Sequence, residues 1–176
     1  MQNNNYIEGA ELKAFKATQK LSRETIHFTA KIYYKGKHIA DVFNDGGGGS
    51  HQIDMIDYEL GQEMKKEILK LPLYEFSKEF ATPWDWELWI TEEVSKHLLQ
   101  EDFKSALRTM KKKLLLYNES DNEFYTFAKL PGLDYEAEKT KKMAYKEFGK
   151  EYQILNYMSK EEVNEIQRIH RDRLYK

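Results

Sequence analysis

One short segment of the chain has residue types that suggest binding chemistry without a familiar motif. Its residues, in order, are Asn44, Asp45, Gly46, Gly47, Gly48, Gly49, Ser50 and His51. Ordering four consecutive glycines costs more backbone entropy than ordering other residues, so a purely structural loop has little reason to contain them. A main chain without side chains lets a partner approach closely, and successive glycine N–H groups can form a nest for an anion. We predict that this segment, called here the glycine loop, contacts a partner or a ligand. A plain linker between two elements is the alternative.

The known phosphate-binding patterns are absent from the glycine loop. Ser50 follows the glycines, but no lysine precedes it as the GxxxxGK[ST] pattern requires, and GxGxxG does not occur. The letters GGGGS also match a common engineered linker, whereas the preceding Asn–Asp–Gly is typical of a native turn. A nucleotide-like anion therefore stays the second hypothesis for the ligand.

The residues that follow the glycines could bind a metal or simply begin a helix. His51, Asp54 and Asp57 lie within seven positions, and a histidine with two carboxylates can ligate a divalent cation. Acidic residues are also common at helix starts, where the helix dipole stabilises them. We favour the helix start and predict no metal site and no cofactor.

Nucleophilic catalysis has no recognisable residue set in this chain. There is no cysteine, no GxSxG pattern and no serine with an evident His–Asp partner. We predict no catalytic residues, although a triad is defined by geometry and an enzyme stays open.

A second candidate contact is the tryptophan-rich segment TPWDWELWI. Trp86 and Trp89 are spaced i, i+3 and would both face the core of a helical segment. The alternative is an exposed aromatic patch that contacts a protein, and we include Trp84 and Trp86 as candidate contact residues on that basis. The intervening Asp85 and Glu87 disfavour a nucleic-acid backbone there.

Composition predicts one folded, cytoplasmic α+β domain over residues 1–176, with a frayed tail at residues 1–5. Of the 176 residues, 40% are hydrophobic and 14% aromatic, which is typical of a globular domain. The formal net charge of -2 gives no overall attraction to nucleic acid or to a membrane. No apolar run approaches the roughly 20 residues that span a bilayer, and the polar N-terminus lacks a signal-peptide pattern.

The elements expected along the chain form an N-terminal antiparallel meander followed mainly by helices. We expect a sheet of ~4–5 strands packed with about four helices. Strands are predicted at 10–18, 25–34, 38–43, 123–129 and 151–156. Helices are predicted at 56–71, 91–117 and 134–148, with a last helix opened by the capping box of Ser159 and Glu162. Residues 74–80 are a short helix or an extended link.

The second and third strands form a hairpin whose register the sequence leaves open. Lys35–Gly36 makes the turn, and a two-residue turn would turn Asp41 inward. A three-residue turn would place Ala40 and Val42 on the core face instead.

The hairpin and the glycine loop together resemble small uncharacterised proteins of bacteriophages and mobile elements. The residues that carry the resemblance are Phe28, Thr29, Ala30, Ile32, Tyr33, Gly36, Lys37, Ile39, Asn44, Asp45, Gly46, Gly48 and Gly49. The resemblance implies a phage-like setting, in which short proteins often act by binding host components. We therefore expect a non-enzymatic protein that sequesters or inhibits a host protein, including a component of anti-phage defence, in the host cytoplasm. A nucleotide-like ligand is the alternative, nucleic acid is not expected, and a homo-oligomer stays open.

Overall fold

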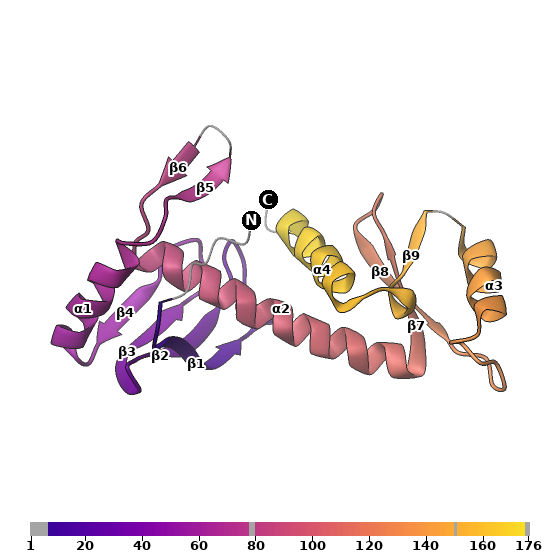
Figure 1. Cartoon of the computed structure of the whole chain (residues 1–176), viewed down its shortest axis with the longest axis horizontal. Coiled ribbons are helices and arrows are strands. Elements are labelled where there is room, and N and C mark those ends of the chain that lie inside the picture. Colours follow the sequence, from indigo (N-terminus) through magenta and orange to yellow (C-terminus); the bar gives the residue numbers. More distant parts are fainter. Residues whose placement is uncertain (1–6, 78–79, 150, 175–176) are drawn as a thin grey trace. The chain divides into compact units, whose positions relative to one another are not determined.

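A computed structural model describes residues 7–77, 80–149 and 151–174 of the chain. The predicted α+β class is confirmed, because the described residues form four helices and several antiparallel sheets (Figure 1). The chain divides into two compact units, Met1–His97 and Leu98–Lys176, each with its own sheet. The expected frayed tail at residues 1–5 lies outside the described residues. Among the described residues, every helix is too short or too polar to cross a bilayer.

The first unit is built on a four-stranded antiparallel sheet. Its strands are β1 (Ala10–Ala17), β2 (Phe28–Tyr34), β3 (Lys37–Asn44) and β4 (Gln52–Met55), in the spatial order β1-β2-β3-β4. A short 3-10 helix, η1 (Gln19–Leu21), lies in the connection from β1 to β2. Strand β4 was not predicted from the sequence, since it has only four residues. The glycine loop therefore connects two neighbouring strands, not a strand and a helix.

A β-bulge settles the register of the hairpin. Tyr34 pairs with Lys37, as a two-residue turn requires, and the register then shifts between Ile32 and Tyr33. The extra residue is Ile39, which is buried together with Ala40 and Val42. Asp41 faces outward, where its carboxylate pairs with Lys31 at 3.1 Å. The bulge thus allows a two-residue turn at Lys35–Gly36 while Ala40 and Val42 face the core and Asp41 does not.

Along the chain, a short helix and a small hairpin follow β4 and precede the long helix. Helix α1 (Tyr58–Ile68) begins two residues later than predicted, with the Asp57 carboxylate accepting a hydrogen bond from the N–H of Leu60 at 3.0 Å. Strands β5 (Tyr74–Ser77) and β6 (Phe80–Thr82) pair with each other, which supports the extended alternative for residues 74–80.

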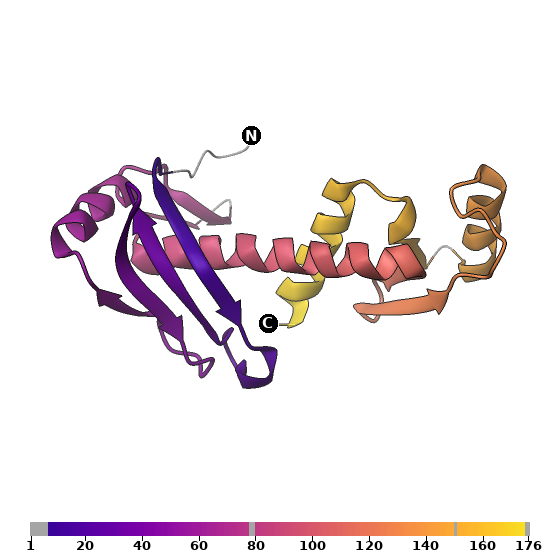
Figure 2. The ribbon, with the colours of Figure 1, turned by 90° about the horizontal axis from the view of Figure 1, so that it is seen from below.

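The long helix α2 (Trp86–Lys112) starts and ends earlier than predicted. Asp85 caps its start, since its carboxylate accepts a hydrogen bond from the N–H of Leu88 at 2.8 Å. Thr91, where the sequence predicted the helix to begin, lies inside it. The first turns of α2 lie along one face of the sheet of the first unit (Figure 2), where the ring of His97 stacks on Phe15 of β1. Further along α2, Leu107 is 41% exposed, whereas its neighbour Ala106 is buried.

The second unit has a three-stranded antiparallel sheet in the order β8-β7-β9, with helices on both faces. Its further elements are β7 (Lys113–Asn118), β8 (Glu123–Ala128), α3 (Glu138–Phe148), β9 (Tyr152–Ile154), the 3-10 helix η2 (Leu155–Tyr157) and α4 (Lys160–Leu174). The predicted helical end at 114–117 is wrong, because these residues form the central strand β7. The predicted capping box is confirmed, with Glu162 N–H donating to the Ser159 hydroxyl at 3.2 Å and Ser159 N–H donating to the Glu162 carboxylate at 2.8 Å.

Candidate functional site

The glycine loop is held at its base by the side chain of Asn44, the last residue of β3. Asn44 is only 2% exposed. Its Oδ1 accepts hydrogen bonds from the Thr25 hydroxyl and from Gly46 N–H, both at 2.8 Å. Its Nδ2 donates to the Gly49 carbonyl at 2.8 Å and lies 3.2 Å from Nδ1 of His51. One buried amide therefore ties the beginning and the end of the loop together.

The connection between β1 and β2 supports the loop from the other side. The carbonyl of Gly46 accepts hydrogen bonds from the N–H groups of Arg23, Glu24 and Thr25, at 3.0, 3.1 and 3.3 Å. Gly46 is itself buried. The first part of the loop is thus a fixed piece of the fold.

Most of the N–H groups that could form an anion nest are already occupied within the chain. Gly46 N–H donates to Asn44, Gly47 N–H donates to the Asp45 carboxylate at 2.9 Å, and Gly48 N–H donates to the Thr25 hydroxyl at 3.2 Å. Of the N–H groups of the four glycines and Ser50, only those of Gly49 and Ser50 donate to no acceptor among the described residues. An anion would therefore find two main-chain donors in this stretch, not a nest of four.

The four glycines differ in whether the fold requires them. Gly46 has φ +82°, and a Cβ there would lie 2.5 Å from the carbonyl oxygen of Leu21. Gly48 has φ +91° and packs against Glu24. Gly47 and Gly49 lack a positive φ; a Cβ on Gly47 would meet only the exposed Asp45 carboxylate, at 3.2 Å, and a Cβ on Gly49 would meet nothing within 4 Å. The fold therefore explains the glycines at positions 46 and 48, but it does not explain those at the exposed positions 47 and 49.

His51 closes the loop against helix α2. Its backbone N–H donates to the Glu87 carboxylate at 2.9 Å, and its Nε2 lies 3.1 Å from the Thr91 hydroxyl. The ring meets Phe28 edge to face, with centroids 5.2 Å apart. Burial lowers the pKa of the His51 imidazole, and the nearby Glu87 carboxylate opposes this effect. The neutral ring is thus the form that fits this position.

The structure separates the three residues considered as metal ligands. His51 precedes β4, Asp54 lies within β4, and Asp57 caps α1. No helical face brings the three side chains together, because the segment from His51 to Met55 is extended. No group of three His, Cys, Asp or Glu side chains that could hold a metal occurs in residues 7–77, 80–149 and 151–174.

The two tryptophans proposed as a second contact lie in different surroundings. Trp84 is 1% exposed, and its indole Nε1 donates to the carbonyl of Pro72 at 2.7 Å. Its burial leaves no ring surface for a partner, so Trp84 belongs to the core. Trp86 is partly exposed and meets the buried Trp89 edge to face at 6.1 Å, so only Trp89 of this i, i+3 pair belongs to the core.

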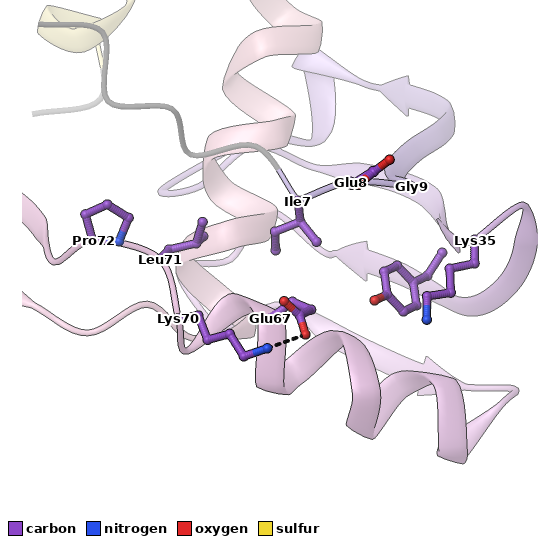
Figure 3. A pocket seen from close by; sticks show the side chains of 9 residues that line it. Ile7, Glu8, Gly9, Lys35, Glu67, Lys70, Leu71 and Pro72 are labelled. Atoms are coloured by element: carbon purple, nitrogen blue, oxygen red, sulfur yellow. Dashed lines mark hydrogen bonds and ion pairs between the residues drawn. The ribbon is translucent and has the colours of Figure 1, made fainter.

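The first unit contains a cleft that no sequence pattern indicated. It has a volume of about 680 Å³, and Figure 3 shows its lining. The walls come from the residues before β1, the β2–β3 turn and the end of α1, which are far apart in the sequence, so no local signal marks the cleft. Its two lysines are both paired with glutamates of α1: Lys35 with Glu63, and Lys70 with Glu67 at 2.7 Å. The cleft therefore carries little unbalanced charge.

Comparison with known proteins gives no assignment. No protein-family model matches the chain, and neither the curated proteins nor the solved structures contain a significant match to it.

Proposed function

We propose that this protein acts by binding another protein and not by catalysis, and that the glycine loop is its contact surface. The observation that carries the proposal is the presence of two exposed glycines, Gly47 and Gly49, that the fold does not require. Glycine at such a position carries an entropic cost on ordering, which close approach by a partner would explain.

The loop is also suited to present its main chain. Asn44 and His51 fix its two ends, so little of the loop has to be ordered on binding. The N–H groups of Gly49 and Ser50 are exposed donors that a carbonyl or carboxylate of a partner can accept. Recognition would therefore combine main-chain hydrogen bonds with close packing on Gly47 and Gly49.

A protein partner is better supported than a nucleotide. A phosphate needs several converging donors, and three of the loop N–H groups already donate to side chains of this chain. The resemblance to bacteriophage and mobile-element proteins then indicates the kind of partner. It would be a host protein, such as a component of anti-phage defence, that binding sequesters or inhibits in the host cytoplasm.

The test compares the immobilised full chain with two single variants in capture from a bacterial lysate, read out by quantitative mass spectrometry. Gly49→Val places a branched side chain in open space on the loop. Gln62→Leu, on an exposed position of α1, is the control for an added apolar surface. We expect the same enriched host protein with the wild type and with Gln62→Leu, and its loss with Gly49→Val. Equal capture by all three proteins would contradict the proposal.

A thermal-shift series with nucleotides tests the ligand alternative. A ligand present at 100 times its Kd stabilises the folded state by about 2.7 kcal/mol, which is readily detected as a rise in Tm. The proposal predicts no rise with any nucleotide.

A further inference from the structure

The second unit contains a hollow of about 350 Å³ lined by three cations and no carboxylate. Its lining residues are Ser105, Arg108, Thr109, Lys112, Lys113 and Thr126. The first four recur at i, i+3, i+4 and i+7 and so lie on one face of α2. Lys113 begins β7, and Thr126 comes from β8, where it pairs with Leu115. One helix face and two adjacent strands thus bring these side chains together.

The cations of this hollow have no acidic partner. Arg108, Lys112 and Lys113 form no ion pair with any described residue. Other lysines of the chain do: Lys96 pairs with Glu93 at 2.6 Å, and Lys141 pairs with Glu138 at 3.4 Å. The hollow therefore concentrates unbalanced positive charge in a protein whose formal net charge is -2.

The surrounding sequence places more positive charge here than the fold needs. The segment 104–113, KSALRTMKKK, has five cations and no acidic residue. Lys104 and Arg108, and then Arg108 and Lys112, are like charges at i, i+4, a spacing that disfavours the helix. Cations at the very end of a helix complement its dipole, but this effect falls off within the last turn and does not account for Lys104.

The side chains in the hollow have the chemistry that recognises phosphate. A guanidinium such as that of Arg108 binds two phosphate oxygens at once, and lysine ammonium groups add point charges. The hydroxyls of Ser105 and Thr126 donate to no described group, whereas Thr109 Oγ1 already donates to the Ser105 carbonyl at 3.1 Å. One guanidinium, two ammonium groups and two hydroxyl donors therefore line the same hollow.

We infer that this hollow binds the sugar–phosphate backbone of a nucleic acid. The exposed cations from Lys104 to Lys112 extend over ~12 Å of helix, at 1.5 Å per residue. That length matches a linear polyanion, whereas a single phosphate ion would contact only one or two of these cations. Contacts of this kind carry no base sequence information. The site consists of residues of the second unit, whereas the glycine loop belongs to the first, and the inference does not depend on the proposed function of that loop.

The experiment measures fluorescence anisotropy of a short labelled single-stranded oligonucleotide, titrated with the full chain between about 50 and 200 mM salt. The test variant carries Arg108→Gln, Lys112→Gln and Lys113→Gln. The control carries Lys139→Gln, Lys142→Gln and Lys146→Gln, three exposed positions of α3. Both variants lose three positive charges, so they share the same net charge, and their melting temperatures check folding.

We expect the test variant to bind at least about tenfold more weakly at low salt, and its salt slope to fall by about 2, since each lost phosphate contact removes ~0.7 from the slope for a single strand. The control should bind like the wild type. An equal loss in both variants, unchanged binding by the test variant, or no wild-type binding at about 50 mM salt would overturn the inference. Displacement of the oligonucleotide by poly-glutamate or by inorganic phosphate at matched ionic strength would also overturn it, since the site would then bind an acidic protein or a free phosphate.

Discussion

The hydroxyl of Thr25 donates a 2.8 Å hydrogen bond to Oδ1 of Asn44, across 19 positions of the chain. The same hydroxyl accepts the N–H of Gly48, and the same Oδ1 accepts the N–H of Gly46. The pair thus links the connection between β1 and β2 to both structural glycines of the loop. The part of the glycine loop that contains Gly46 and Gly48 therefore belongs to the fold, so changes there should alter stability. Changes at Gly47 and Gly49 should instead alter binding.

Replacing Gly46 with alanine should destabilise the protein strongly. The residue has φ +82°, and the new Cβ would lie 2.5 Å from the backbone oxygen of Leu21, which cannot move aside as a side chain end can. We expect a loss of more than about 2 kcal/mol in the free energy of unfolding. Urea denaturation measures it, with Gly49→Ala as the matched control, which should change stability little. Equal stability of the two variants would show that the loop does not pack as described.

The Thr25–Asn44 pair should act as one unit in a double-mutant cycle. Asn44→Ala leaves the buried N–H of Gly46 without its acceptor, and unsatisfied buried groups cost about 1–3 kcal/mol each. Thr25→Val keeps the shape but removes the bridging hydroxyl. The two losses should fail to add, with an interaction energy of about 0.5–3 kcal/mol by chemical denaturation. Strict additivity would mean that the two side chains act independently.

Lowering the pH should weaken the fold through His51. Burial lowers the pKa of its imidazole in the folded state, so below a pH of about 6.5, the ordinary value, the unfolded state binds the proton more readily. The contribution of the neutral ring is therefore complete above about pH 6.5 and is lost as the pH falls towards the lowered folded pKa. His51→Gln removes this titration, so the difference in unfolding free energy between wild type and variant should shrink on acidification. A difference that is flat or grows would contradict the assignment.

Local sequence patterns predicted the elements of this fold better than the contacts among them. The alternation in residues 28–34 and the capping box at Ser159 are local, and both were found. The segment 114–117 was misassigned to a helix because four consecutive apolar residues fit either a helix end or a strand buried on both faces. In the structure, Leu114 and Leu116 pack on one side of β7, and Leu115 and Tyr117 on the other. Whether residues 114–117 end a helix or form a strand depended on β8 and β9, which come later in the chain and pair with them.

The glycine loop shows the same limit at the level of the site. The sequence drew attention to residues 44–51, and its polar ends suggested a native turn. It could not separate Gly46 from Gly49, because the reason for Gly46 is the carbonyl of Leu21, which lies 25 positions earlier in the chain. The basic hollow is a similar case, since Thr126 joins Arg108 only when β8 pairs with β7. In each case, contacts between distant parts of the chain decide the role of a residue.

The most direct test of the account is the dissociation constant of the captured host protein for the wild type and for Gly49→Val, measured by isothermal titration calorimetry alongside the melting temperature of each. Because position 49 is open in the folded protein, the melting temperature should stay the same. The side chain would keep the partner from the main chain, so binding should weaken by at least tenfold, or about 1.4 kcal/mol. An unchanged dissociation constant would contradict the claim that this loop is the contact surface.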